Sequence, residues 1–177
     1  MTVRGAEEET SETPGPWRPP SARERLRILE ETRTIAIVGA SSNPARASYF
    51  VATYLLSSST GYTIWFVNPR ETSILGRPVY PTLADLPEPP DLVDVFRRSS
   101  ELPEVAREAV AAKARTFWAQ LGLWNDEAAQ IAYEGGLSVV MNRCVKIEHA
   151  RFAGGLHLAG FDSGVINAKR PTRPGPT

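Results

Sequence analysis

Residues 34–56, TIAIVGASSNPARASYFVATYLL, contain the strand, the turn and the helix that decide the fold. The run TIAIV (34–38) is apolar and rich in β-branched residues, which is typical of a strand buried on both faces. It ends at Gly39, and glycine permits a sharp turn. After the loop, apolar residues recur at the spacing of one helix face: Ala47, Phe50, Val51, Tyr54 and Leu55.

The rest of the chain repeats this alternation of strand and helix signals. Four more apolar runs predict strands: YTIWFV (62–67), LVDVF (92–96), RTFWA (115–119) and LSVVM (137–141). Helical spacing recurs over 102–110, and Asn125 is a suitable N-cap for a helix over 126–134. The stretch ILGRPVYPTLADLP (74–87) has room for at most a short strand and a helical turn. We therefore expect an α/β, Rossmann-like three-layer fold, with a parallel sheet of about five strands and helices on both faces.

The two ends of the chain differ in composition from this central part. Residues 1–20 are rich in Glu, Thr, Pro and Gly, which predicts a flexible N-terminal tail. Ser21 and Glu24 form a capping-box pattern, so a helix is expected over about 22–32. The Pro-rich residues 170–177 predict a loose C-terminal tail, leaving one domain over 21–169.

Composition excludes several classes of function. Lys plus Arg equals Asp plus Glu, 20 against 20, which argues against a nucleic-acid partner. No apolar run is long enough to span a membrane, and the N-terminus lacks a secretory signal. The single cysteine, Cys144, allows no internal disulfide. These features predict a cytoplasmic protein.

Polar residues follow the predicted strands where a parallel sheet binds its ligands, beyond the carboxyl ends. In the first loop, Gly39 with Ser41, Ser42 and Arg46 predicts a site for a diphosphate at the start of the helix. The loop lacks the glycines of the G-x-G-x-x-G dinucleotide fingerprint. The second strand ends in Asn68-Pro69-Arg70 rather than in an acidic residue, which favours a phosphate on the ribose. Coenzyme A and NADP both fit these features.

Several segments in order resemble one known family. They are IVGASSNPARASYFVATYL, YTIWFVNPRETSILGRPVYPTLADLP, DLVDVFRRSSELPEVAREAV, FWAQLGLWNDEAAQIAYEGGLSVVMNRCVKIEH and GVINAKR, which together span about residues 34–170. The chain resembles the stand-alone CoA-binding proteins, which are related to the CoA-binding domain of succinyl-CoA synthetase. The resemblance implies a Rossmann-like fold that binds CoA or an acyl-CoA, with no established catalytic activity and no catalytic residues.

The resemblance also implies roles for individual residues. It places Gly39, Ala40 and Ser41 on the phosphates, with help from Arg46. It places Asn68, Pro69 and Arg70 beside the adenosine and its extra phosphate. Along the adenine wall it places Val95, Phe96 and Arg97, and near the pantetheine arm Gln120 and Gly122. The family often carries an aspartate at the position of Asn142, so a role that needs a carboxylate there does not transfer.

Other interpretations of the chain stay open. An NADP-dependent oxidoreductase would fit the same loops, although no tyrosine here is followed four residues later by a lysine. A regulatory partner protein with an unused nucleotide site is a third hypothesis. Cys144 follows the last strand, where it could meet the thiol of CoA. His149 and His157 lack metal-ligand spacing, and we expect no metal.

Overall fold

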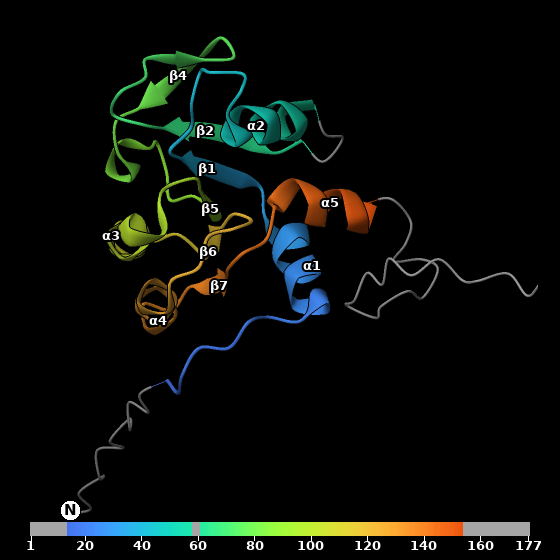
Figure 1. Ribbon diagram of the computed structural model, residues 1–177, viewed down its shortest axis with the longest axis vertical. Helices are drawn as coiled ribbons and strands as arrows, with labels where there is room; N and C mark the ends of the chain where they lie inside the picture. The colour runs from blue at the N-terminus through green and yellow to red at the C-terminus, as the bar shows by residue number, and fades with distance from the viewer. Residues whose placement is uncertain (1–13, 58–60, 154–177) are drawn as a thin grey trace, which may run out of the picture.

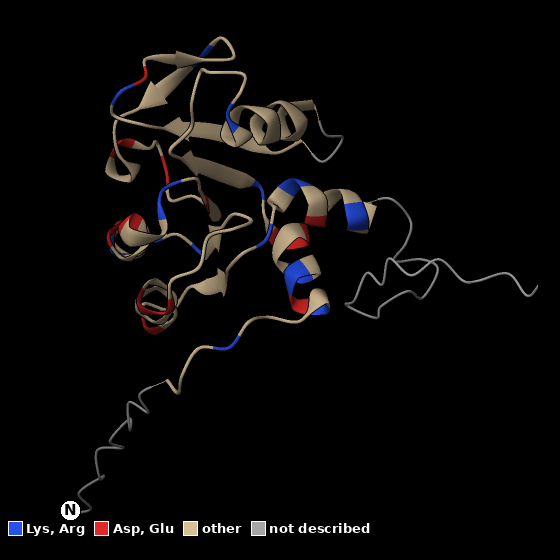
Figure 2. Cartoon of the chain, in the orientation of Figure 1, with Lys and Arg blue, Asp and Glu red and all other residues tan. Residues whose placement is uncertain are grey.

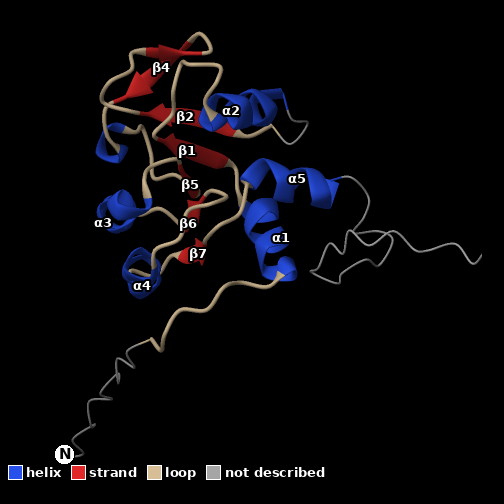
Figure 3. Ribbon diagram, in the orientation of Figure 1, coloured by secondary structure: helices blue, strands red, loops and turns tan. Residues whose placement is uncertain are grey.

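A computed structural model describes residues 14–57 and 61–153. Its centre is a seven-stranded sheet in the order β3-β4-β2-β1-β5-β6-β7. The strands are β1 (Thr34–Val38), β2 (Thr63–Val67), β3 (Ser73–Ile74), β4 (Arg77–Tyr80), β5 (Leu92–Val95), β6 (Thr116–Ala119) and β7 (Ser138–Val140). All neighbouring pairs are parallel except β3 with β4. The expected Rossmann-like α/β fold is confirmed (Figure 3).

Helices cover both faces of the sheet (Figure 1). One layer holds α1 (Ala22–Glu31), α2 (Ala47–Ser57) and α5 (Val145–Ala153), and the other holds α3 (Leu102–Ala111) and α4 (Asp126–Glu134). Alternate residues of each strand point to opposite layers, as strand geometry requires. In β5, Leu92 packs with the α2 layer and Val93 with the α3 layer. The sheet is therefore buried on both sides, which explains why its strands appear as continuous apolar runs.

Local capping signals account for the first residues of two helices. The capping box of Ser21 and Glu24 is present at the start of α1. Asn125 accepts a hydrogen bond from the Ala128 backbone N–H and begins α4 at the expected residue. Two features were not predicted from the sequence. The stretch 74–87 takes part in two short strands rather than one, and α5 follows the last strand, with Val145 and His149 on its buried side.

The segment before α1 lies along the outer edge of β7. The backbone N–H of Trp17 donates to the side chain of Gln130, and its indole donates to the carbonyl of Val139. The Trp17 ring also packs against Trp124, with ring centroids 5.5 Å apart. This segment therefore covers an edge strand that would otherwise expose unpaired backbone groups. Among the described residues, no helix is long and apolar enough to cross a membrane.

Candidate functional site

The loop after β1 lies between the carboxyl ends of its two neighbouring strands. Gly39 donates its backbone N–H to the carbonyl of Val67 in β2, and its φ is +79°. A Cβ atom at Gly39 would stand 2.8 Å from the carbonyl oxygen of Phe96, directly after β5. Only glycine satisfies both the backbone angle and this close approach. The loop is thus held against the next two strands before it reaches α2.

Hydrogen bonds between residues close in sequence shape the rest of this loop. The Ser41 backbone N–H donates to the hydroxyl of Ser48, and the Asn43 backbone N–H donates to the hydroxyl of Ser41. The side-chain oxygen of Asn43 accepts from the Ala45 backbone N–H, closing a turn just before α2. Arg46 is exposed beside the start of α2. The loop therefore presents backbone donors, hydroxyls and one cation at a helix N-terminus, which is chemistry suited to an anion.

A carboxylate of the protein itself occupies part of this loop. Glu71 accepts a hydrogen bond from the Ser42 backbone N–H at 3.0 Å and one from the Ser41 hydroxyl at 3.5 Å. The hydrogen bonds from Ser42 and Ser41 hold the pKa of the Glu71 carboxyl below its usual value. Glu71 was not predicted from the sequence, because it follows the second strand and reaches back to the first loop. The Glu71 contacts show that these hydrogen-bond donors can bind a negatively charged oxygen.

Replacing Glu71 by glutamine is expected to raise the affinity for an anionic ligand of this loop. A diphosphate must take the donors that Glu71 holds, and the neutral amide repels it less. We expect CoA to bind about two- to fivefold more tightly, the size typical of one exposed charge interaction. Titration calorimetry at low salt measures this change. Glu88→Gln, an exposed carboxylate on the loop before β5, is the matched control. Unchanged or weaker binding of CoA by Glu71→Gln would show that this carboxylate does not compete.

The loop after β2 is tied to the first loop. The Asn68 side-chain amide donates to the carbonyl of Ala40 at 2.7 Å, and its oxygen accepts from the Arg70 backbone N–H. Pro69 and Arg70 are exposed. The structure therefore brings the Asn68–Arg70 segment beside Gly39–Ser42, as a shared ligand site requires. Figure 2 shows the basic start of α2 and the basic loop after β5, whereas α3 and α4 are mainly acidic.

A pocket of about 430 Å³ opens on the other side of the first loop. It is bounded by the start of α2, the loops after β5 and β6, and the start of α5; its lining includes Phe96, Arg97, Gln120 and Cys144. Four of the residues expected at the site thus meet in one cavity. Val95 is fully buried in the α3 layer, and Gly122 donates its N–H to the side-chain oxygen of Asn142 instead of lining the cavity.

Beneath the pocket lies a buried carboxyl group that the sequence analysis missed. Asp94 of β5 is fully buried, and one of its oxygens accepts a hydrogen bond from the Gln120 side-chain amide. Its other oxygen has no hydrogen-bond partner among the described residues. Burial raises the pKa of Asp94 to about 8, against a smaller lowering by the Gln120 hydrogen bond. A charged residue inside the apolar run LVDVF was the available signal for this group.

Two other features of the described residues do not join this site. No group of His, Cys, Asp and Glu among them has the arrangement of a metal site. His149 contacts the Tyr54 hydroxyl, and His157 lies outside the described residues.

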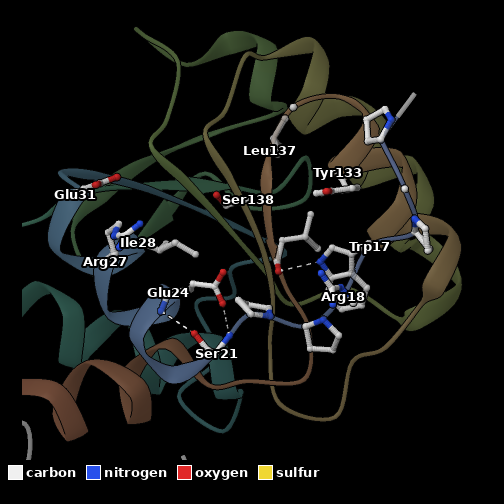
Figure 4. A pocket seen from close by; sticks show the side chains of 17 residues that line it. Trp17, Arg18, Ser21, Glu24, Arg27, Ile28, Glu31, Tyr133, Leu137 and Ser138 are labelled. Carbon is white, nitrogen blue, oxygen red and sulfur yellow. Dashed lines mark hydrogen bonds between the residues drawn. The ribbon is translucent and has the colours of Figure 1, made fainter. Parts of the chain in front are cut away.

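A larger hollow of about 1220 Å³ lies beside the segment before α1 (Figure 4). The Ser21 and Glu24 side chains there are used to cap α1. This hollow lies at the amino end of β7, opposite the end at which such sheets bind ligands.

Comparison with known proteins finds relatives over most of the chain. The sequence model of the family described as "CoA binding domain" matches residues 33–150. The uncharacterized protein YneT of Bacillus subtilis (strain 168) is 42% identical over 131 residues, which cover 74% of this chain and 96% of YneT. A hypothetical protein from Pyrococcus horikoshii OT3 superposes with a TM-score of 0.72 at 36% identity, covering 79% of this chain and 99% of that one.

A larger enzyme shares only the fold. The dinucleotide-forming acetyl-coenzyme A synthetase 1 of Ca. Korarchaeum cryptofilum superposes with a TM-score of 0.56 at 22% identity, over 64% of this chain and 27% of that chain. The family match covers all seven strands and both loops of the candidate site. The chain belongs to the CoA-binding domain family.

Proposed function

We propose that this protein binds coenzyme A beyond the carboxyl ends of β1, β2 and β5. The observation that carries the proposal is the anion-accepting loop Gly39–Arg46, whose donors at Ser41 and Ser42 already hold the carboxylate of Glu71. A diphosphate offers the same kind of charged oxygen to the same donors. Membership of the CoA-binding domain family supports CoA as the molecule that carries this diphosphate.

In the proposed complex, each part of CoA meets a different group of residues. The diphosphate lies on Gly39, Ala40, Ser41 and Ser42, with Arg46 nearby. The adenosine and its 3′-phosphate lie beside Asn68, Pro69 and Arg70. The adenine wall includes Phe96 and Arg97, and Val95 supports it from the core. The pantetheine arm runs past Gln120 and the Gly122 loop toward Cys144, whose thiol would then lie near that of CoA.

We further infer that the protein acts as a binding module in the cytoplasm. Its one cysteine suits a reducing compartment. The ligand is a CoA-type small molecule, and neither nucleic acid nor membrane is needed for this function. The proposal assigns no catalytic residue.

Arg70 provides the sharpest test of the placement. A charge-assisted hydrogen bond from its guanidinium to the 3′-phosphate predicts that Arg70→Ala weakens CoA binding roughly ten- to a hundredfold. Dephospho-CoA should bind the unaltered protein more weakly by a similar factor. Arg70→Ala should then bind CoA and dephospho-CoA equally, because the group that distinguishes them is gone. Titration calorimetry of both proteins with both ligands gives the four affinities.

Controls separate this result from general effects of charge. Arg77→Ala removes an exposed cation from the amino end of β4, and it should leave CoA affinity almost unchanged. NADP tests the alternative of an oxidoreductase. Binding of NADP without CoA would overturn the proposal in favour of that alternative. Binding of neither would favour a regulatory partner protein with an unused site.

A further inference from the structure

Exposed apolar side chains gather at the pocket beside the first loop. Three of them are large and lie on separate elements: Phe50 of α2 is 61% exposed, Leu121 after β6 is 65% exposed and Ile147 of α5 is 51% exposed. All three line the 430 Å³ pocket. The other large exposed hydrophobic residues among those described, Trp124 and Tyr133, line no part of it. Convergence of such side chains on one cavity is typical of a site for an apolar ligand.

The inside of the pocket is poor in polar groups. Ala47, Val51, Phe96 and Leu123 form much of its apolar wall. Gln120 is the polar side chain at its base, and its amide nitrogen is already used by Asp94. The amide oxygen of Gln120 takes no part in that hydrogen bond and can accept one from a ligand. A ligand here can therefore place one donor on Gln120, and its remaining surface must be mostly hydrocarbon.

Two cations, Lys146 and Arg97, also line this pocket. The Lys146 ammonium group stands 4.0 Å from the centre of the Phe50 ring, in cation–π geometry. The Arg97 side chain passes close to Gly39. Its Cδ atom lies 3.2 Å from the position that a Cβ atom would take at Gly39. An anionic group of a ligand can therefore contact Arg97 or Lys146 while its apolar part lies on the apolar wall.

The pocket is continuous with the proposed diphosphate loop. Ala47, the first residue of α2, lines the pocket and directly follows that loop. Phe96 lines it too, and its carbonyl faces Gly39. A ligand anchored by its diphosphate can therefore extend into the pocket. In the proposed complex the pantetheine arm passes Gln120 and Cys144, which line this pocket. Its amides and thiol are polar, so they leave Phe50, Leu121 and Ile147 without a hydrocarbon group to pack against.

We propose that this pocket holds the acyl chain of a CoA thioester, so that the protein prefers acyl-CoA with an apolar chain to free CoA. The inference rests on the proposed function, because the CoA part supplies the anchor. It adds the class of ligand: a thioester whose chain packs among Phe50, Leu121 and Ile147.

The test is a calorimetric series with free CoA and its acetyl, butyryl, hexanoyl and octanoyl thioesters. Affinity should rise by up to about fourfold for each methylene that becomes buried, as the transfer of ~0.8 kcal/mol per CH₂ implies. The rise should stop once the chain emerges from the pocket. Phe50→Ala and Ile147→Ala should flatten the rise, so that octanoyl-CoA loses clearly more affinity than free CoA does. Both side chains are exposed, so the variants should fold. Tyr133→Ala, an exposed aromatic on α4, is the matched control.

The outcomes separate this inference from the proposed function. Equal affinity for free CoA and every thioester would overturn the acyl preference and leave CoA binding intact. No binding of any of the five ligands would overturn both. If sedimentation shows a dimer of the unaltered chain that Phe50→Ala and Ile147→Ala dissociate, a second copy covers these side chains and the acyl site is rejected.

Discussion

Replacing Glu148 by alanine should lower the free energy of unfolding by about 3–5 kcal/mol. Glu148 of α5 is almost fully buried, and its Oε2 atom accepts a hydrogen bond from Nε of Arg25 at 2.8 Å. Arg25 belongs to α1 and is also buried, so alanine would leave its guanidinium without a carboxylate in a low-dielectric environment. Arg143 and Arg151 approach the other oxygen of Glu148 at 3.8 Å and 3.7 Å. This carboxylate therefore joins α1, α5 and the loop after β7.

Urea unfolding followed by circular dichroism measures the loss. Glu104→Ala is the matched control, because Glu104 is an exposed glutamate whose contact with Arg107 spans 3.4 Å. It should cost less than ~1 kcal/mol. The double variant Arg25→Met with Glu148→Met should recover part of the stability, since neither member of the Arg25–Glu148 pair is then left buried without the other. A loss below ~1 kcal/mol for Glu148→Ala would show that the pair contributes little to holding the two helices together.

Raising the pH from 6.5 to 8 should destabilise the protein by up to about 1.4 kcal/mol per pH unit, through Asp94 alone. Burial raises the pKa of Asp94 to about 8 in the folded protein, whereas the unfolded value is near 3.8. The folded state therefore keeps a proton that the unfolded state has lost. The stabilisation that the Asp94 proton provides is fully present below pH ~4. It declines as pH rises from ~4 to ~8, and it changes little above pH ~8.

Asp94→Asn isolates this contribution, because asparagine keeps the shape of the side chain and cannot ionise. The variant should lose the decline between pH 6.5 and 8 and become more stable than the unaltered protein at pH 8. Burial lowers the pKa of His149, so its contribution is lost as pH falls and opposes that of Asp94 below pH ~7, in the variant and the unaltered protein alike. Asp126→Asn, at an exposed carboxyl, should keep the decline. Parallel pH profiles for Asp94→Asn and the unaltered protein would contradict the assignment.

The sequence was sufficient for the fold wherever one local pattern determined one element. The apolar run at 34–38 must be buried on both faces, and Asn125 supplies an N-cap whatever surrounds it. The structure confirms both. The β3–β4 pair was harder to predict because each strand is short and its stability depends on pairing with a neighbour. The helix α5 was missed; its buried Glu148 pairs with the distant residue Arg25, a contact that no local pattern encodes.

The candidate site was predictable in its loops but not in its long-range contacts. Gly39 and Asn68 could be placed because parallel strands bring their carboxyl ends to one edge. The contact of Glu71 with Ser42 joins two loops, and no local pattern encodes it. Phe50, Leu121 and Ile147 come from three elements far apart in the chain, so only the folded structure reveals that they share a cavity.

The most direct test of CoA binding at the carboxyl ends of the strands is a titration with CoA followed by backbone amide NMR. Binding there predicts large shifts for the N–H groups of Ala40, Ser41, Ser42, Ala47 and Ser48. The backbone N–H of Trp17, beside the larger hollow, should not move. Shifts confined to Trp17 and its neighbours, or no shifts at saturating CoA, would contradict the proposed site.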